Sequence, residues 1–167
     1  MVSTSGCELS KNEVVVAMKE RLMSYATVIT PNLIETGVLL GHPVHTVEEM
    51  KAAARELLSL GCQAVLVKGG HLEGHTMCDV LQTADREEPY LFTAPHVESP
   101  NTHGTGCSLS SAIATYLAKG ETVAVAVEKA KEFVYRGIDA AKDVHIGEGH
   151  DPINHFFAPL PLEAEEC

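Results

Sequence analysis

The sequence predicts an α/β protein built on a parallel sheet. Three observations lead to this class: short apolar segments typical of buried strands alternate with helical patterns, polar clusters follow the ends of these strands, and a glycine-rich turn opens one of the helices. The chain has 167 residues, enough for one domain with a substantial core. Functional groups of parallel sheets gather at the carboxyl ends of the strands, so a site is expected there.

Helices and strands alternate through the first half of the chain. Pro31 ends the first apolar strand, and Gly61 ends the clearest helix. That helix begins at Thr46, and Glu49 three residues later completes a capping box. The elements expected in this half are helices over residues 12–24, 33–40 and 46–61, and strands over residues 26–30 and 64–68.

The second half begins with a predicted β-hairpin, because a charged turn over residues 84–89 separates two short apolar segments. Its expected elements are strands over residues 79–83 and 90–94 and helices over residues 104–118 and 122–142. Residues 158–167 have the composition of an acidic disordered tail. No strand precedes the first helix, although a βα unit normally supplies one, so the pattern is typical of the second half of a larger fold.

Composition and charge narrow the function. The formal net charge is −11, with 12 lysine and arginine residues and no basic cluster, which argues against a nucleic-acid partner. A nucleotide would be bound locally, by glycine-rich loops, a few lysines and a divalent cation. The five cysteines form no disulfide framework, the first residues are unlike a signal peptide, and no apolar segment approaches a membrane span of about 20 residues. We therefore expect a cytoplasmic protein without a membrane partner.

The most informative segment is Asn101 to Ser111, in which Gly104, Thr105 and Gly106 precede Cys107 and a helical pattern. A glycine turn at a helix N-terminus directs several backbone N–H groups at one point, and the helix dipole adds positive potential, so the turn can bind a phosphate. Cys107 lies in the first helical turn, where the same field favours a thiolate over a thiol. The turn therefore fits phosphoryl or acyl transfer. A packing turn followed by a small core cysteine is the alternative.

Two further polar clusters follow predicted strands, at residues 30–32 and 68–70. Lys68 comes directly after four apolar strand residues, which is an unusual place for a solvated side chain. Glu35 lies close to a strand end, although a solvated helix glutamate is the alternative there. Together with the turn at residues 103–107, three polar clusters are expected at one edge of the sheet.

Four segments occur in the order found in a known family: Thr30 to Glu35, Val65 to His71, Asn101 to Ser108 and Gly147 to Phe156. With them the chain resembles the hydroxymethylpyrimidine/phosphomethylpyrimidine kinases of thiamine biosynthesis, within the ribokinase-like superfamily. The resemblance covers residues 1–157. It implies a three-layer fold with a mostly parallel sheet and helices on both faces. It also implies an ATP-dependent kinase that phosphorylates the hydroxymethyl group of the pyrimidine and then the resulting monophosphate.

The resemblance assigns roles to individual residues of this chain. Gly104, Thr105 and Gly106 would line the anion hole for the transferred phosphoryl group. Cys107 would take the proton of the acceptor, where most of the superfamily has aspartate. Mg²⁺ and the phosphates would be organised by Asn32 and Glu35. The residues implied to bind the nucleotide are Asn32, Glu35, Lys68, Gly70 and Lys131, the last of them near the adenine.

Family members are longer and begin with a glycine-rich substrate loop and further strands, which are absent here. Of the Asp-Pro-Val-Met-Val segment usual in the family, only Met1-Val2 is present. We therefore expect residues 1–157 to be the nucleotide and catalytic part of a ribokinase-like domain, without most of its acceptor part. A mis-assigned gene start, a true short product and one piece of a split enzyme all fit. Pyridoxal kinase activity and an inactive subunit that needs a partner stay open as alternatives. The unpaired strand edge predicts a homodimer or an aggregation-prone fragment.

Overall fold

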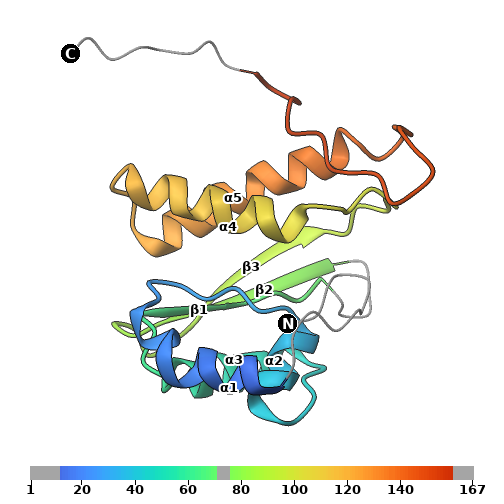
Figure 1. Cartoon of the computed structure of the whole chain (residues 1–167). Coiled ribbons are helices and arrows are strands. Elements are labelled where there is room, and N and C mark those ends of the chain that lie inside the picture. Colours follow the sequence, from blue (N-terminus) through green and yellow to red (C-terminus); the bar gives the residue numbers. More distant parts are fainter. Residues whose placement is uncertain (1–11, 71–75, 160–167) are drawn as a thin grey trace. The chain divides into compact units, whose positions relative to one another are not determined.

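The computed structural model describes residues 12–70 and 76–159 and divides the chain into two compact units (Figure 1). Unit 1 comprises residues 1–96 and unit 2 residues 97–167. Unit 1 contains α1 (Asn12–Arg21), a short 3₁₀-helix (Met23–Tyr25), α2 (Leu33–Leu40), α3 (Val47–Leu58), β1 (Ala64–Val67), β2 (Thr76–Thr83) and β3 (Tyr90–Pro95). Unit 2 contains α4 (Thr105–Ala118) and α5 (Val123–Asp139). Every helix and strand predicted from the sequence has a counterpart here except the strand at residues 26–30.

The sheet of unit 1 has the order β1-β2-β3, and both strand pairs are antiparallel. Val67 of β1 lies opposite Val80 of β2, which lies opposite Leu91 of β3. The predicted hairpin is therefore present, but the strand that precedes it is antiparallel to it. Chain length explains this difference from a mostly parallel sheet, because residues 68–75 are too few for the crossover that a parallel connection needs.

Parallel pairing occurs where the strand at residues 26–30 was predicted. This segment forms two isolated parallel bridges with β1 and its end, Ile29 with Val65 and Asn32 with Lys68. The Ile29 N–H donates to Ala64 O at 3.1 Å, and the Leu66 N–H donates to Ile29 O at 2.8 Å. The segment thus lies in the sheet position that the parallel prediction requires, without forming a regular strand.

The opposite edge of this segment is open within the described residues. The backbone groups of Val28 and Thr30, which alternate with the bonded groups of Ile29, have no backbone partner in residues 12–70 and 76–159. An open edge of this kind can accept another extended chain.

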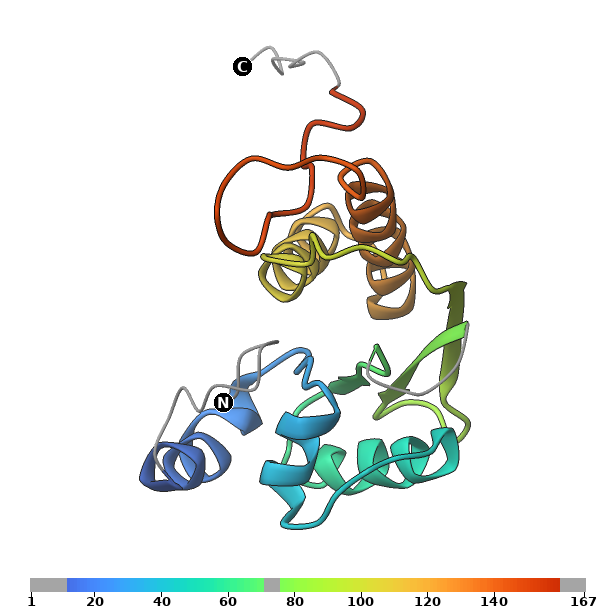
Figure 2. The same cartoon turned by 90° about the vertical axis from the view of Figure 1, so that its right-hand side faces the viewer.

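The core of unit 1 lies between α3 and the sheet, with α2 packed beside α3 (Figures 1 and 2). Met50 and Leu57 of α3 are fully buried, as are all four residues of β1. The predicted capping box begins α3, because Thr46 Oγ1 accepts from the Glu49 N–H and Glu49 accepts from the Thr46 N–H. Gly61 follows the helix with a φ of 98°, a value that favours glycine.

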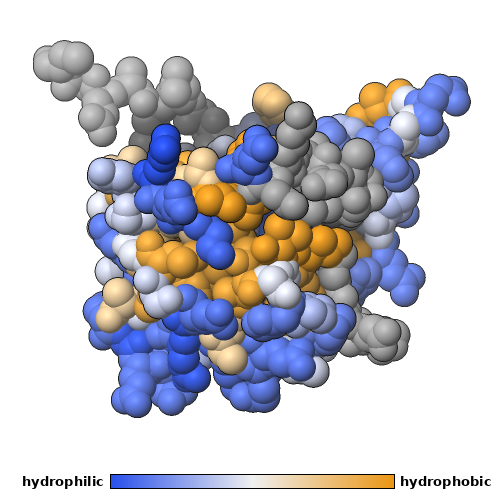
Figure 3. All heavy atoms as spheres, turned by 60° about the horizontal axis from the view of Figure 1, so that its bottom comes forward, coloured by the Kyte–Doolittle hydropathy of each residue, from blue (hydrophilic) through white to orange (hydrophobic). Residues whose placement is uncertain are grey.

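Hydrophobic side chains are also exposed on α1 and α2. The exposed fractions reach 50% at Val16 and 44% at Val38. Figure 3, in which the bottom of Figure 1 comes forward, shows a hydrophobic area in the middle of this face. A contiguous exposed hydrophobic area on a folded protein is typical of an interaction surface.

Unit 2 is built on α4 and α5, which pack side by side. Thr122 caps α5, with its hydroxyl accepting from the Val125 N–H. The chain after α5, which we call the closing segment (residues 141–155), runs past the start of α4 (Figure 1). No helix in the described part of the chain has the length and apolar character needed to cross a membrane.

Candidate functional site

The end of β1 brings two of the predicted polar clusters together in unit 1. The Lys68 N–H donates to Pro31 O at 2.9 Å, and Asn32 pairs with Lys68 in a parallel bridge. The Lys68 side chain is half-buried, whereas Gly70 is exposed and is the last described residue before position 76. The sequence prediction that residues 30–32 and 68–70 lie together is confirmed by this pairing.

Asp79 holds the turn after β1 in place. Its side chain is buried, and Oδ1 accepts from the Gly69 N–H at 2.7 Å. A hydrogen bond to a carboxylate is stronger than one between neutral groups, so this contact fixes the backbone beside Lys68. Asp79 was not predicted from the sequence, although an aspartate among the apolar residues of β2 was a usable signal.

Asn32 and Glu35 form a capping box at the start of α2. Asn32 Oδ1 accepts from the Glu35 N–H at 2.8 Å, and Glu35 Oε2 accepts from the Asn32 N–H at 2.9 Å. Asn32 is buried, whereas Glu35 is half-buried. These two predicted site residues therefore have a structural role in the helix start, which the sequence analysis did not assign to them.

The predicted glycine turn begins α4 in unit 2. Gly104 has a φ of 88°, a conformation that other residues rarely adopt. The Thr105 N–H donates to Thr102 O at 3.3 Å, but those of Gly106 and Cys107 have no acceptor among the described residues. Two N–H groups at the positive end of a helix can bind an anion. The Cys107 thiol is exposed, so it is not a packing residue of unit 2.

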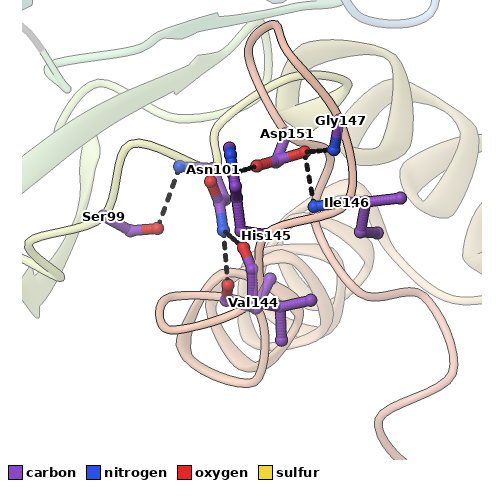
Figure 4. Close-up of polar contacts among 8 residues, drawn as sticks. Ser99, Asn101, Val144, His145, Ile146, Gly147 and Asp151 are labelled. Carbon is purple, nitrogen blue, oxygen red and sulfur yellow. Dashed lines mark hydrogen bonds and ion pairs between the residues drawn. The ribbon is translucent and has the colours of Figure 1, made fainter.

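Asn101 ties the start of this turn to the closing segment (Figure 4). The residue is 2% exposed, and its Nδ2 donates to both Ala141 O and Val144 O at 2.6 Å. Its own N–H donates to Ser99 Oγ at 3.0 Å. Asn101 thus joins the end of α5 to the chain that enters α4.

Asp151 organises the closing segment itself (Figure 4). Its buried carboxylate contacts His145 Nδ1 at 2.5 Å and accepts from the N–H groups of Ile146 and Gly147 at 3.1 and 3.2 Å. Burial of the carboxylate raises its pKa, but the hydrogen bond with His145 and the two backbone donors outweigh this effect. The pKa of Asp151 therefore lies below its ordinary value, and the carboxylate is charged at neutral pH.

Further contacts join the closing segment to both helices. Ser108 Oγ lies 2.7 Å from His155 Nε2, and the Asn154 N–H donates to Gly137 O at 3.0 Å. Lys131 lies half-buried on α5, eight residues before its last residue, Asp139. Eight residues of helix span about 12 Å, so Lys131 is remote from the end of α5 that meets the glycine turn.

The phosphomethylpyrimidine kinase family matches residues 1–154 of the chain. The hydroxymethylpyrimidine/phosphomethylpyrimidine kinase of Rhizobium meliloti is 41% identical over 157 residues, which cover 93% of this chain and 58% of the relative. The chloroplastic thiamine biosynthetic bifunctional enzyme of Arabidopsis thaliana is 44% identical over 160 residues, covering 94% of this chain and 30% of the relative. The chain therefore spans well under two thirds of the length of these relatives.

Solved structures give the same picture of the fold. The ADP complex of Bacillus subtilis pyridoxal kinase matches with a TM-score of 0.79 and 36% identity, covering 89% of this chain and 55% of that one. A phosphomethylpyrimidine kinase from Clostridium difficile matches with a TM-score of 0.68 and 35% identity, covering 83% of this chain and 54% of that one. These similarities confirm the ribokinase-like α/β fold predicted from the sequence.

Proposed function

We propose that this chain, which belongs to the phosphomethylpyrimidine kinase family, is the nucleotide and catalytic part of an ATP-dependent kinase. Its acceptors are the hydroxymethylpyrimidine precursor of thiamine diphosphate and the monophosphate of that pyrimidine. The glycine turn carries the proposal, because it combines two N–H groups that have no acceptor among the described residues with the exposed Cys107 thiol. Charge neutralisation and alignment are what phosphoryl transfer requires from a protein.

Cys107 is the general base in this proposal. Its thiolate takes the proton of the acceptor hydroxyl, the hydroxyl oxygen attacks the γ-phosphorus, and the bond to the bridging oxygen of ADP breaks. The N–H groups of Gly106 and Cys107 stabilise the charge on the transferred phosphoryl oxygens. Lys68 contacts the nucleotide phosphates, and Gly70 gives them close access to the backbone. Lys131 binds the nucleotide near its adenine.

Mg²⁺ would neutralise phosphate charge, and the two predicted residues fit it unequally. Asn32 Oδ1 is engaged at the start of α2, and one Glu35 oxygen accepts from the Asn32 N–H. Mg²⁺ commonly keeps several waters and takes one or two carboxylates, so Glu35 fits as a ligand through water. Asn32 acts by holding Glu35 in position.

Nucleotide binding and turnover test the proposal separately. Titration calorimetry with ADP and Mg²⁺ measures whether the 167-residue chain binds nucleotide, and coupled ADP release measures phosphorylation of hydroxymethylpyrimidine. We expect nucleotide binding from the chain alone and slow turnover, because the chain covers 58% of the length of the Rhizobium meliloti kinase. Absence of ADP binding by a folded chain contradicts the proposal.

Pyridoxal kinase activity is the second candidate. The observation in its favour is the similarity to solved pyridoxal kinases, including one from Staphylococcus aureus described in complex with AMP-PCP and pyridoxal, with a TM-score of 0.80 and 32% identity. Parallel assays with pyridoxal and hydroxymethylpyrimidine distinguish the two acceptors. A kcat/KM for pyridoxal that exceeds the value for hydroxymethylpyrimidine reverses the order of the candidates.

A partner chain is the third element of the proposal. The open edge at Val28 and Thr30 and the exposed hydrophobic area in Figure 3 both favour association with a second copy, which gives a homodimer or an aggregation-prone fragment. Alternatively, the chain is an inactive subunit completed by another polypeptide. Supplying the part of the Rhizobium meliloti kinase that the match leaves uncovered, as a separate chain, tests this: gain of turnover indicates a subunit, and unchanged turnover argues against one.

The cysteines support a cytoplasmic location for this activity. Cys62 and Cys107 are both free thiols in the described part of the chain. A reducing compartment preserves thiols, which a cysteine base requires.

A further inference from the structure

We propose that Asn101 and Asp151 are positioning residues that set the direction of the N–H groups at the start of α4. This inference rests on the proposed function, in which those groups bind the transferred phosphoryl group. Neither residue needs to touch the substrate. Both act through the closing segment, which contacts the glycine turn at its beginning and again at Ser108.

Asn101 fixes the chain three residues before Gly104. Both carbonyl groups that accept from its Nδ2 lie beyond the regular part of α5, at Ala141 and Val144. A planar amide that donates to two acceptors has one orientation, because rotation breaks both bonds. The direction in which the chain enters the glycine turn is therefore set from the end of α5.

Asp151 fixes the residue next to Gly104. The His103 N–H donates to Asp151 O and the Ile153 N–H donates to His103 O, each at 3.3 Å. These bonds clamp residue 103 between two residues of the closing segment. The Asp151 carboxylate holds the preceding turn through Ile146 and Gly147, so the clamp depends on a charged and buried side chain.

Gly137 shows that the closing segment must pass close to α5. A Cβ atom at this position would lie 3.2 Å from Asn154 O and 3.4 Å from Ile153 Cδ1. Glycine is unfavourable inside a helix relative to alanine, so its presence here has a packing reason. Substitution with alanine should therefore strengthen α5 locally while pushing the closing segment away from it.

Hydrogen exchange on the full chain tests the inference directly, because it reports on each backbone segment without requiring activity. We expect Asp151→Asn to speed exchange of the Thr105 and Ser108 amides, which donate to backbone acceptors at the turn, by roughly tenfold, a factor that corresponds to about one net hydrogen bond. The matched control is Asp143→Asn, which removes an exposed carboxylate from the same segment and should leave exchange at the turn unchanged. Affinity for AMP-PCP, which carries a γ-phosphate, should fall in Asp151→Asn and not in Asp143→Asn.

Gly137→Ala is the second variant, chosen because it favours the folded helix. Faster exchange at Thr105 and Ser108 with unchanged or slower exchange in α5 supports the inference. Faster exchange confined to residues 145–151 overturns it, as does uniform acceleration across α4 and α5 in both variants. If the wild-type chain binds no ADP while the exchange coupling is present, the proposed function fails and the positioning role stands.

Discussion

The two units hold their predicted site residues in different ways. In unit 1 the side-chain contacts are local, because Asn32 and Glu35 are three residues apart and Asp79 is ten residues from Gly69, while backbone pairing joins the more distant Pro31 and Lys68. In unit 2 the glycine turn is held by residues 40, 43 and 47 positions further along the chain. A site of the first kind is sensitive to its immediate neighbours, whereas a site of the second kind is sensitive to substitutions far away in the sequence.

The largest effect is expected from Cys107 in unit 2. Cys107→Ala should lower kcat by about 10²- to 10⁴-fold, the range typical of general-base catalysis, with little change in ATP affinity. Cys107→Asp should retain partial activity, because carboxylates have this role in the wider superfamily. The measurement is steady-state turnover of hydroxymethylpyrimidine with varied ATP.

Cys167→Ala serves as the control, since it removes a thiol of the same chain outside the described residues. Turnover in Cys107→Ala close to that of the control contradicts the role of the thiol as base. The glycine turn would then be an anion site without a catalytic thiol.

Lys68 in unit 1 should give the next largest effect. Lys68→Ala should raise the KM for ATP by about 10- to 100-fold, the cost of losing a charge-assisted hydrogen bond. Lys51→Ala is the control, because that lysine pairs with Glu48 on the surface of α3. The contrast between the two units is supported if Lys68→Ala changes KM while Cys107→Ala changes kcat. It is contradicted if the ATP dependence of turnover is the same in both lysine variants.

Local patterns explain how much of this structure could be predicted. Thr46 and Glu49, a capping pair within four residues, predict the start of α3. The residue type of Gly104 alone predicts a positive φ. The antiparallel pairing of β1 with β2 was missed because an apolar strand carries no mark of its direction. It could have been inferred from the short connection between them.

The long-range contacts could not be predicted from spacing. Asn101 and Asp151 both occur in motifs of the family resemblance. Nothing in the sequence indicates that the segment entering α4 contacts the closing segment about 40 residues or more further along the chain. For Asn32 and Glu35 the opposite applies: Asn at a helix start with Glu three residues later is a capping signal. This pattern predicts the capping box, whereas the family resemblance implies a role for the same residues in Mg²⁺ and phosphate binding.

The open edge of unit 1 provides a test with a smaller effect. Val28→Lys places a charge where a second chain would pair, and should raise the dimer dissociation constant by roughly tenfold, as the loss of one or two backbone hydrogen bonds implies. Analytical ultracentrifugation measures the change. The control is Val38→Lys on the exposed face of α2. Dissociation in Val38→Lys alone assigns self-association to the hydrophobic helix face and not to the strand edge.

The smallest effect is expected from the two capping boxes of unit 1, of which only the one at Glu35 has a proposed role in Mg²⁺ binding. Glu35→Gln and Glu49→Gln both weaken a helix start, but only Glu35→Gln should raise the Mg²⁺ concentration needed for half-maximal ATP binding, by less than about tenfold because contact through water is indirect. Titration of Mg²⁺ at fixed ATP measures this shift. Equal Mg²⁺ dependence in the two variants leaves Glu35 a capping residue only.

Lowering the pH provides a further test of the Glu49 capping box. The backbone N–H of His45 is the main donor that lowers the pKa of Glu49, against a smaller opposing effect of desolvation. Because the folded pKa is below the unfolded value of 4.5, the carboxylate stabilises the folded state above that pH and loses this effect as pH falls through the folded pKa. The difference in unfolding free energy between the wild-type chain and Glu49→Gln should therefore be largest near neutral pH and shrink below pH 4.5. A difference that persists unchanged in acid would show that the Glu49 charge does not stabilise the start of α3.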